Sequence, residues 1–394
     1  MKKNKNNSGV RIKSLRLLSM ALCLVTFGSA QTDGNQVQHG VVFYEDGKYG
    51  GWPANHGIWT WDNEILIGFV EASYYAENRG LHTYDISTSR NKYARSLDGG
   101  STWKISDAYE AGQKAWGHDN YIPEKEAVRP VPMTKPIKDF TDPGFILTFL
   151  RHNNDDGPSH FYYSMDKGKS WEGAFEFPDL GISGIANRTD YIVDGKQSMT
   201  LFVTTAKSNR KEGRVALVRT TDGGLSWNLE SWITPEHGGF DIMPSSLRLS
   251  DTELFTTIRT RTENGVDYIS AYRSTDNGKT WKRLKDPTPY TGRGGSPPAL
   301  TKLKDGRLAL GYIFRSEYGS RVHVRFSKDN GETWGDEITL RCDDGANRDT
   351  GYPRITQNAD GKIVMVYYWN NALTKEDKPY RYIAYTMFDP AQFN

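Results

Sequence analysis

Five copies of one short pattern recur along the chain at nearly constant spacing. Each copy starts with Ser or Thr, carries Asp two residues later and then Gly, and ends with Ser or Thr followed by Trp. The copies occupy residues 96–103, 164–171, 220–227, 274–281 and 327–334, so successive aspartates are 68, 56, 54 and 53 residues apart. A repeat of about this length, with strand-like runs between the copies, predicts an all-β propeller made of four-stranded sheets.

The residue types in the pattern match the needs of a tight turn. The Asp carboxylate can accept hydrogen bonds from the backbone N–H groups of its own turn, and Gly supplies a position with positive φ. The later hydroxyl can bond back to the turn, while the Trp ring packs between neighbouring sheets. We therefore assign the five copies a structural role and no catalytic one.

The five copies resemble the Asp box, also called the bacterial neuraminidase repeat, of sialidase-like propellers. The resemblance covers the whole chain after its first 30 residues. It implies that the boxes lie on the face of the propeller away from the active site.

Strand pairs with Asp-Gly or Asp-Asn turns lie between the boxes. The predicted inner pairs span residues 56–70, 140–152, 187–206, 242–261, 296–315 and 352–369. Six pairs with five boxes predict six blades, the last of which reaches the end of the chain without its outer strand. We expect residues 40–44 to supply that strand, which closes the ring and removes an exposed sheet edge. Residues 31–394 then form one propeller domain.

The beginning of the chain predicts export. Six Lys and Arg residues precede an apolar run over residues 17–27, and Gly28-Ser29-Ala30 follows. Residues 1–30 read as a secretory signal peptide, too short to span a membrane, with cleavage after Ala30. Cys23 follows the bulky Leu22, which disfavours a lipoprotein anchor. We expect a periplasmic or secreted protein with no membrane span.

Composition limits the partners of the exported chain. Without the signal peptide, Cys342 is the single cysteine, so we expect stability from a large core and not from a disulfide. The formal charge is +2 for the whole chain and −4 once the basic residues of the signal peptide are removed. This balance does not suggest a nucleic-acid partner.

Arginines gather at one predicted mouth of the propeller channel, where first strands begin and second strands end. They are Arg151, Arg188, Arg259, Arg261, Arg293, Arg315, Arg348 and Arg354. Guanidinium groups bind carboxylate or sulfate through paired N–H donors, so this set predicts an anionic ligand. The alternative for any one of them is an ion pair with a surface carboxylate. As substrate-binding residues we select Arg151, Arg261, Arg293, Arg315 and Arg354.

Four of the eight histidines map near the same mouth: His56, His82, His152 and His160. Because histidine exchanges protons near neutral pH, such a group favours acid–base catalysis. We select His56 and His152, together with Tyr352, as catalytic residues. No His-x-x-x-His or similar spacing is present, so we predict no metal site and no cofactor.

The resemblance to sialidases is incomplete at the site. Sialidases of this fold use three arginines on the substrate carboxylate, an Asp as acid/base and a Tyr nucleophile activated by a Glu. Their first arginine lies in a Phe/Tyr-Arg-Ile-Pro motif, but residues 52–56 here read Trp-Pro-Ala-Asn-His. Tyr352 matches the nucleophile, while Arg261 and Arg315 are candidates for the other arginines. Asp85 is the candidate acid, although its surroundings do not match the family pattern.

The combination of His, Tyr and Arg suits β-elimination on a uronic acid. A cation on the carboxylate makes the neighbouring C5 proton removable, because it stabilises an enolate-like state. The chain also resembles Asp-box proteins of bacterial polysaccharide degradation, including that of ulvan, a sulfated, uronate-rich glycan. Our leading hypothesis is an exported lyase or oligosaccharide dehydratase acting on the non-reducing end of acidic oligosaccharides. The alternatives are an exo-α-sialidase or related glycoside hydrolase using Tyr352, and a non-catalytic propeller that binds acidic glycans.

Overall fold

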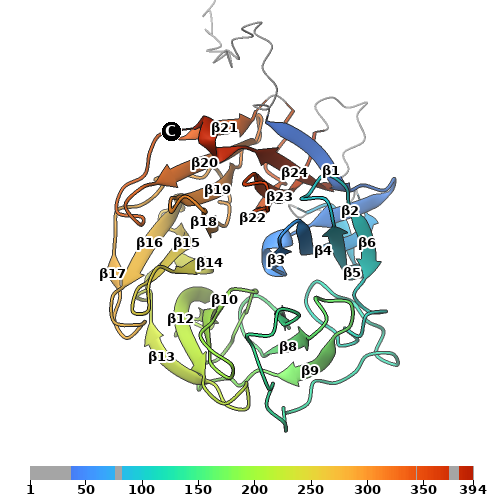
Figure 1. The fold of residues 1–394 in the computed structure, drawn as a ribbon. Coiled ribbons are helices and arrows are strands. Elements are labelled where there is room, and N and C mark those ends of the chain that lie inside the picture. Colours follow the sequence, from blue (N-terminus) through green and yellow to red (C-terminus); the bar gives the residue numbers. More distant parts are fainter. Residues whose placement is uncertain (1–36, 76–81, 343, 372–380, 394) are drawn as a thin grey trace, which may run out of the picture. The chain divides into compact units, whose positions relative to one another are not determined.

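Six antiparallel sheets surround one axis in the computed structural model, which describes residues 37–75, 82–342, 344–371 and 381–393 (Figure 1). The chain divides into two units, Met1–Thr32 and Asp33–Asn394, and the described residues all belong to the second. The predicted signal peptide over residues 1–30, its cleavage after Ala30 and the exclusion of an anchor at Cys23 thus lie outside the described residues. The six sheets confirm the predicted all-β, six-bladed propeller.

The blades follow one another around the ring in sequence order (Figure 1). The first three contain β2 (Lys48–Gly51), β3 (Ile58–Trp61), β4 (Glu64–Tyr74), β5 (Tyr84–Ser96) and β6 (Lys104–Asp107); β7 (Ile146–Arg151), β8 (Ser159–Ser164) and β9 (Glu172–Glu176); and β10 (Tyr191–Val193), β11 (Met199–Ala206), β12 (Glu212–Thr220) and β13 (Asn228–Trp232). The 3-10 helix η1 (Pro53–Asn55) joins β2 to β3.

The other three blades complete the ring. They contain β14 (Phe240–Arg248), β15 (Leu254–Arg261), β16 (Asp267–Ser274) and β17 (Lys282–Arg283); β18 (Ala299–Lys302), β19 (Leu308–Phe314), β20 (Arg321–Ser327) and β21 (Ile338–Arg341); and β22 (Gly351–Gln357), β23 (Ile363–Trp369), β24 (Tyr382–Phe388) and β1 (Gln38–Phe43). The second 3-10 helix, η2 (Pro390–Gln392), follows β24. In the part of the chain that the structure describes, no helix is long and apolar enough to cross a membrane.

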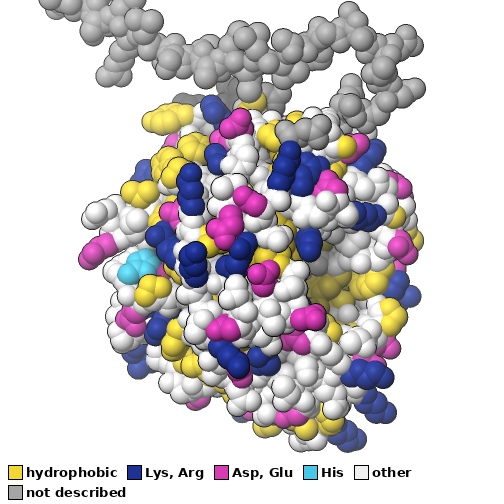
Figure 2. Space-filling model, turned by 60° about the vertical axis from the view of Figure 1, so that its left-hand side comes forward, with side chains coloured by type: hydrophobic (Ala, Val, Ile, Leu, Met, Phe, Trp, Pro, Cys, Tyr) yellow, Lys and Arg dark blue, Asp and Glu magenta, His cyan; other side chains and the backbone are white. Residues whose placement is uncertain are grey.

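The core lies between the blades. β7, β11 and β23 are buried along their whole length, because each sheet packs against a neighbour on both faces. β23 is accordingly apolar throughout, whereas β7 and β11 also bury threonines, and β7 ends in the buried Arg151. At the surface, Lys and Arg side chains are interspersed with Asp and Glu over the face seen in Figure 2.

The five repeats form the same turn. In the first, Ser96 donates to the Asp98 carboxylate and accepts from the Gly100 N–H, while Thr102 donates to that carboxylate through its N–H and its hydroxyl. The hydrogen bonds from Thr102 lower the pKa of Asp98 to about 2, so the acceptor stays ionised. The same bonds recur at Asp166, Asp222, Asp276 and Asp329.

Each repeat places its Trp against an aromatic ring of the preceding blade. The pairs are Trp103 with Tyr385, Trp171 with Tyr93, Trp227 with Phe161, Trp281 with Phe202 and Trp334 with Phe255. The sixth blade has no such repeat. There Phe393, just after η2, stacks on Phe326 of the fifth blade with ring centroids 6.5 Å apart. Phe393 thus occupies the place that the Trp residues take elsewhere.

The second blade differs from the prediction of an inner strand pair over residues 140–152. Among the described residues only β7 is a strand there, and β8 is its single strand partner. Side chains from the third blade cover its inner edge: the Tyr191 hydroxyl accepts from the Leu147 N–H at 3.2 Å, and the Thr189 hydroxyl from the Phe149 N–H at 3.2 Å. A sequence pattern does not reveal this replacement, because side-chain hydroxyls accept the hydrogen bonds that the backbone of an inner strand accepts in the other blades.

Replacing Tyr191 with Phe should lower the free energy of unfolding by about 1–3 kcal/mol, because two donors lose their acceptor. These donors are the buried Leu147 N–H and the Trp59 indole N–H, 2.9 Å from the hydroxyl. Urea unfolding measures the effect. The matched control is Tyr318→Phe, at a side chain that is 98% exposed, and should leave stability unchanged. Equal stability of the two variants would contradict this account of the edge.

Candidate active site

Three bulky residues have left-handed backbone conformations at one end of the channel. They are Trp52 (φ 56°), Met243 (φ 54°) and Tyr352 (φ 53°). The last two lie where the pairing register shifts, between Ile242 and Ser245 in β14 and between Gly351 and Arg354 in β22. Bulges of this kind redirect side chains, and strained non-glycine residues of this kind cluster at functional sites.

The two bulges bring Tyr352 and Met243 together across the channel. Both pack in one cluster with Ala54 of η1, Ile242 and Phe240. Tyr352 remains partly exposed, while Met243 is buried. The cluster therefore closes the channel from three blades and leaves the tyrosine at its surface.

An arginine contacts the hydroxyl of Tyr352. Nη1 of Arg259, on β15, donates to it at 3.2 Å, and Nη2 of Arg259 donates to the Gly294 carbonyl. Burial alone would raise the pKa of Tyr352, but the charges of Arg259, Arg315 and Arg188 outweigh it and lower that pKa below its usual value. Among the described residues no carboxylate bonds to this hydroxyl. The positive charge around Tyr352 therefore makes its hydroxyl easier to ionise than that of an ordinary tyrosine.

Of the predicted binding residues, Arg315 is the one whose charge lowers the pKa of Tyr352. It is 2% exposed, and it donates to the carbonyls of Arg348 and Gly295 at 2.7 and 2.9 Å. Arg293 is exposed, and its N–H bonds to the Arg315 carbonyl. Arg293 and Arg315 are thus joined through their backbones, and one of the two is exposed while the other is buried.

The other predicted arginines have protein partners. Arg261 binds Asp267 with two hydrogen bonds of 2.8 and 3.1 Å, and Arg151 binds Asp119 at 2.8 Å. Arg354 donates to the carbonyls of Ala54 and Thr189. Arg151 and Arg261 thus pair with buried and not with surface carboxylates, Arg354 bonds to backbone carbonyls, and contact of these three with a substrate stays a prediction.

The predicted catalytic histidines do not bond to Tyr352. His56 is 2% exposed, and burial lowers its pKa to about 4, so its ring is neutral near pH 7. His152 packs edge-on against Trp116 with centroids 5.0 Å apart, and burial lowers its pKa as well. Their part in catalysis stays a prediction.

Two buried carboxylates lie near the same end of the channel. Asp119 is bound by Arg151, and Asp349 by Arg381 and His82 at 2.8 and 2.7 Å. Burial would raise the pKa of each carboxyl. At Asp119 the charge of Arg151 reverses the effect, and at Asp349 the hydrogen bond and charge of His82 and the charge of Arg381 do so, so both pKa values are lowered.

Sequence reasoning passed over Arg259 in favour of Arg261. Both lie on β15 at positions that share a sheet face, so the alternation of the strand alone does not separate them. Two features distinguish the arginines: the bulge at Tyr352 brings its hydroxyl to Arg259, and Arg261 is hydrogen-bonded to Asp267. Asp119 and Asp349 were not selected either, since their arginine partners lie 32 residues away in each case.

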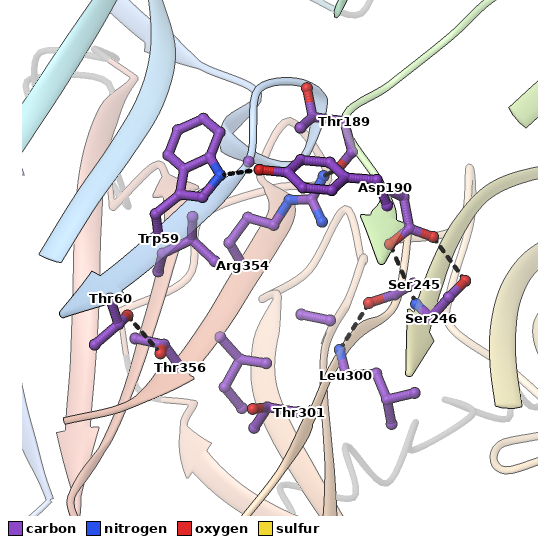
Figure 3. A pocket seen from close by; sticks show the side chains of 15 residues that line it. Trp59, Thr60, Thr189, Asp190, Ser245, Ser246, Leu300, Thr301, Arg354 and Thr356 are labelled. Carbon is purple, nitrogen blue, oxygen red and sulfur yellow. Dashed lines mark hydrogen bonds between the residues drawn. The ribbon is translucent and has the colours of Figure 1, made fainter. Parts of the chain in front are cut away.

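A cavity of about 300 Å³ lies deeper along the channel (Figure 3). Its walls come from the inner strands β3, β10, β14, β18 and β22, and they include Trp59, Arg354 and Asp190. Ser246 donates to Asp190 through its hydroxyl at 2.7 Å and its N–H at 3.3 Å. Burial nevertheless raises the pKa of Asp190 to about 7.

The fold and this site define a six-bladed propeller of the sialidase-like kind. A family model described as a BNR repeat-like domain matches residues 153–365, more than half of the chain, and the chain belongs to this family. No curated protein shows significant sequence similarity to it.

Solved structures share the fold at low sequence identity. A protein of unknown function from Dyadobacter fermentans is 20% identical, with a TM-score of 0.67 over 90% of this chain and 98% of its own. The NanB sialidase from Streptococcus pneumoniae is 13% identical, with a TM-score of 0.56 over 91% of this chain and 71% of its own. The α-L-arabinofuranosidase Arb93A from Fusarium graminearum is 13% identical, with a TM-score of 0.53 over 88% of this chain and 97% of its own.

Replacing Arg259 with Gln should raise the pKa of Tyr352, because the largest nearby positive charge is removed. In the wild type, ultraviolet titration of tyrosinate should show one hydroxyl ionising at lower pH than the others. In Arg259→Gln that step should move to higher pH, and in Tyr352→Phe it should vanish. An unchanged early step in Tyr352→Phe would assign it to another tyrosine.

Asp190 should make stability fall with rising pH. Its pKa is about 7 in the folded protein against an ordinary 3.8, so between these values the native state keeps a proton that the unfolded chain has released. The free energy of unfolding therefore decreases as pH rises through this window. Between about pH 4 and pH 7, the free energy of unfolding of Asp190→Asn should fall less than that of the wild type, as measured by urea unfolding. Parallel losses would contradict the raised pKa.

Proposed function

We propose that the protein is an enzyme that acts on acidic sugars, with Tyr352 as the group that attacks or deprotonates the substrate. The observation that carries the proposal is the contact of 3.2 Å between Arg259 and the Tyr352 hydroxyl, with no carboxylate bonded to that hydroxyl among the described residues. A tyrosine surrounded by positive charge has a lowered pKa, and an ionised phenolate is both a stronger base and a stronger nucleophile.

The charge around Tyr352 also favours an anionic substrate. Arg259, Arg315 and Arg188 all act on the Tyr352 hydroxyl electrostatically, and they are between 2 and 8% exposed. Arg293 is exposed beside them and has no side-chain hydrogen bond to the described residues. We assign Arg293 to direct contact with a substrate carboxylate or sulfate, and the buried arginines to the electrostatic field around it.

Within this class we favour β-elimination on a terminal uronic acid. The Tyr352 phenolate takes the C5 proton, and the electrons of that C–H bond form the C4–C5 double bond. The C4–O bond breaks, and the departing oxygen takes up a proton from a second group. Positive charge near the carboxylate stabilises the enolate-like state that develops in between.

The state of the nearby carboxyl groups supports elimination over hydrolysis. Hydrolysis by a carboxylate pair requires one carboxyl group that holds a proton near neutral pH. Positive charge lowers the pKa of both Asp119 and Asp349. The carboxyl with a raised pKa along the channel, Asp190, lies in the deeper cavity.

Hydrolysis with Tyr352 as nucleophile is the second candidate. It is supported by the names of two structures that share the fold, a sialidase and an α-L-arabinofuranosidase. Binding of acidic glycans without reaction is the third. All three proposals include export to the periplasm or out of the cell, because the sequence predicts a signal peptide.

The test follows the purified protein on uronate-terminated oligosaccharides, with and without sulfate. We expect ultraviolet absorbance from the new C4–C5 double bond to rise, and Tyr352→Phe to lower kcat by about 100-fold or more. The matched control Tyr318→Phe, at a 98% exposed side chain, should keep full activity. Release of free sugar from a sialoside or arabinoside without new absorbance would establish hydrolysis instead. Saturable binding without any product would establish a binding protein.

A further inference from the structure

The eight histidines all lie in the described part of the chain, so each can be judged as a proton-transfer group. A useful one needs a ring nitrogen that faces solvent and a partner that fixes the other nitrogen. His56 and His160 are buried, at 2 and 1% exposure, and the ring nitrogens without hydrogen-bond partners are inside the protein. His323 is equally buried. His39 is exposed on β1, the outer strand of the sixth blade, where its Nδ1 lies 3.0 Å from the Thr386 hydroxyl.

The partly exposed histidines differ in how their nitrogens are used. At His237, Nδ1 accepts from the Gly239 N–H and Nε2 lies 3.0 Å from Asp241, so both nitrogens are occupied. His118 is 3.7 Å from Asp119, longer than a hydrogen bond. His152 has an aromatic partner, Trp116, and no carboxylate partner among the described residues.

His82 meets both requirements. Its Nδ1 lies 2.7 Å from Oδ1 of Asp349, and its side chain is 27% exposed. Its ring packs edge-on against Trp52 with centroids 5.1 Å apart. Nε2 has no hydrogen-bond partner among the described residues. Donation of Nδ1–H to a buried carboxylate sets the tautomer and leaves Nε2 as the exchanging nitrogen.

Asp349 is itself fixed in position by hydrogen bonds, so it can orient the His82 ring. It is 1% exposed, and it receives the Tyr368 hydroxyl at 3.1 Å and Nε of Arg381 at 2.8 Å in addition to His82. Each carboxylate oxygen therefore has a donor that keeps it in place. Such an arrangement fixes a histidine as the carboxylate of a catalytic triad does.

Tyr368 connects this pair to Tyr352. The Tyr368 ring centroid lies 6.4 Å from that of His82 and 6.0 Å from that of Tyr352. The two groups able to exchange protons therefore both pack against one buried tyrosine.

We infer that His82, oriented by Asp349, is the second proton-transfer group of this site and protonates the departing oxygen. The inference rests on the proposed function. In the elimination step, Nε2–H of the protonated ring gives its proton to the C4 oxygen as the C4–O bond breaks, and the ring becomes neutral. Tyr352 holds the C5 proton, and exchange with water restores both groups. Asp349 acts as a positioning residue.

The decisive experiment compares His82→Ala with the wild type on a uronate-terminated substrate in which the wild type forms the C4–C5 double bond. We expect kcat to fall by about 100-fold or more with little change in KM, and added imidazole to restore part of the rate. His237→Ala is the matched control, a partly exposed histidine on a buried aspartate, and should keep full activity. Thermal unfolding of each variant checks that it is folded.

The outcomes separate this inference from the proposed function. If the wild type converts no acidic glycan, the proposed function fails. If the wild type is active, Tyr352→Phe is not, and His82→Ala keeps full activity, the inference alone is overturned. Nitrogen NMR of histidine-labelled protein tests the positioning role directly: a fixed Nδ1–H tautomer at His82 should be present in the wild type and lost in Asp349→Asn. The same tautomer in that variant would contradict the role of Asp349.

Discussion

Every sheet in this protein has two apolar faces, and closure of the ring is what covers both. A propeller blade with a fully buried strand such as β11 or β23 cannot stand alone, since both of its faces need a neighbour. The aromatic contact between one blade and the next is therefore repeated all round the ring. The turn built on Asp98 and its four counterparts sets the direction in which each Trp leaves its own sheet.

The ring is regular in its contacts between blades and irregular along the channel. The second blade lacks an inner strand, and Tyr191 and Thr189 satisfy its edge. Bulges in β14 and β22 turn Met243 and Tyr352 into the channel. Packing around Met243 and Tyr352, together with the hydrogen bond from Arg259, holds these strained positions in place. The proposed site therefore depends on local irregularities in an otherwise repeating fold.

The repeat spacing was sufficient to predict the architecture, because each copy is a local turn whose hydrogen bonds span only a few residues. The strand pairs with Asp-Gly turns were predicted for the same reason. The site was harder. Tyr352 was identified by its place at the start of β22, but its partner Arg259 depends on a bulge that leaves no mark in the sequence. His82 and Asp349 are 267 residues apart, and only the closed ring brings them together.

The two ends of the described chain share one seam. β1 pairs with β24 so that Gln38 faces Met387, and Phe393 stacks on the fifth blade where a Trp would otherwise stand. No hairpin connects β1 to β24, so loop-closure entropy over nearly the whole chain opposes this pairing during folding. We therefore expect the seam to form last. Until the sixth blade and Phe393 are in place, the first and fifth blades each have an uncovered apolar face, so the ring cannot close before the ribosome has added these residues.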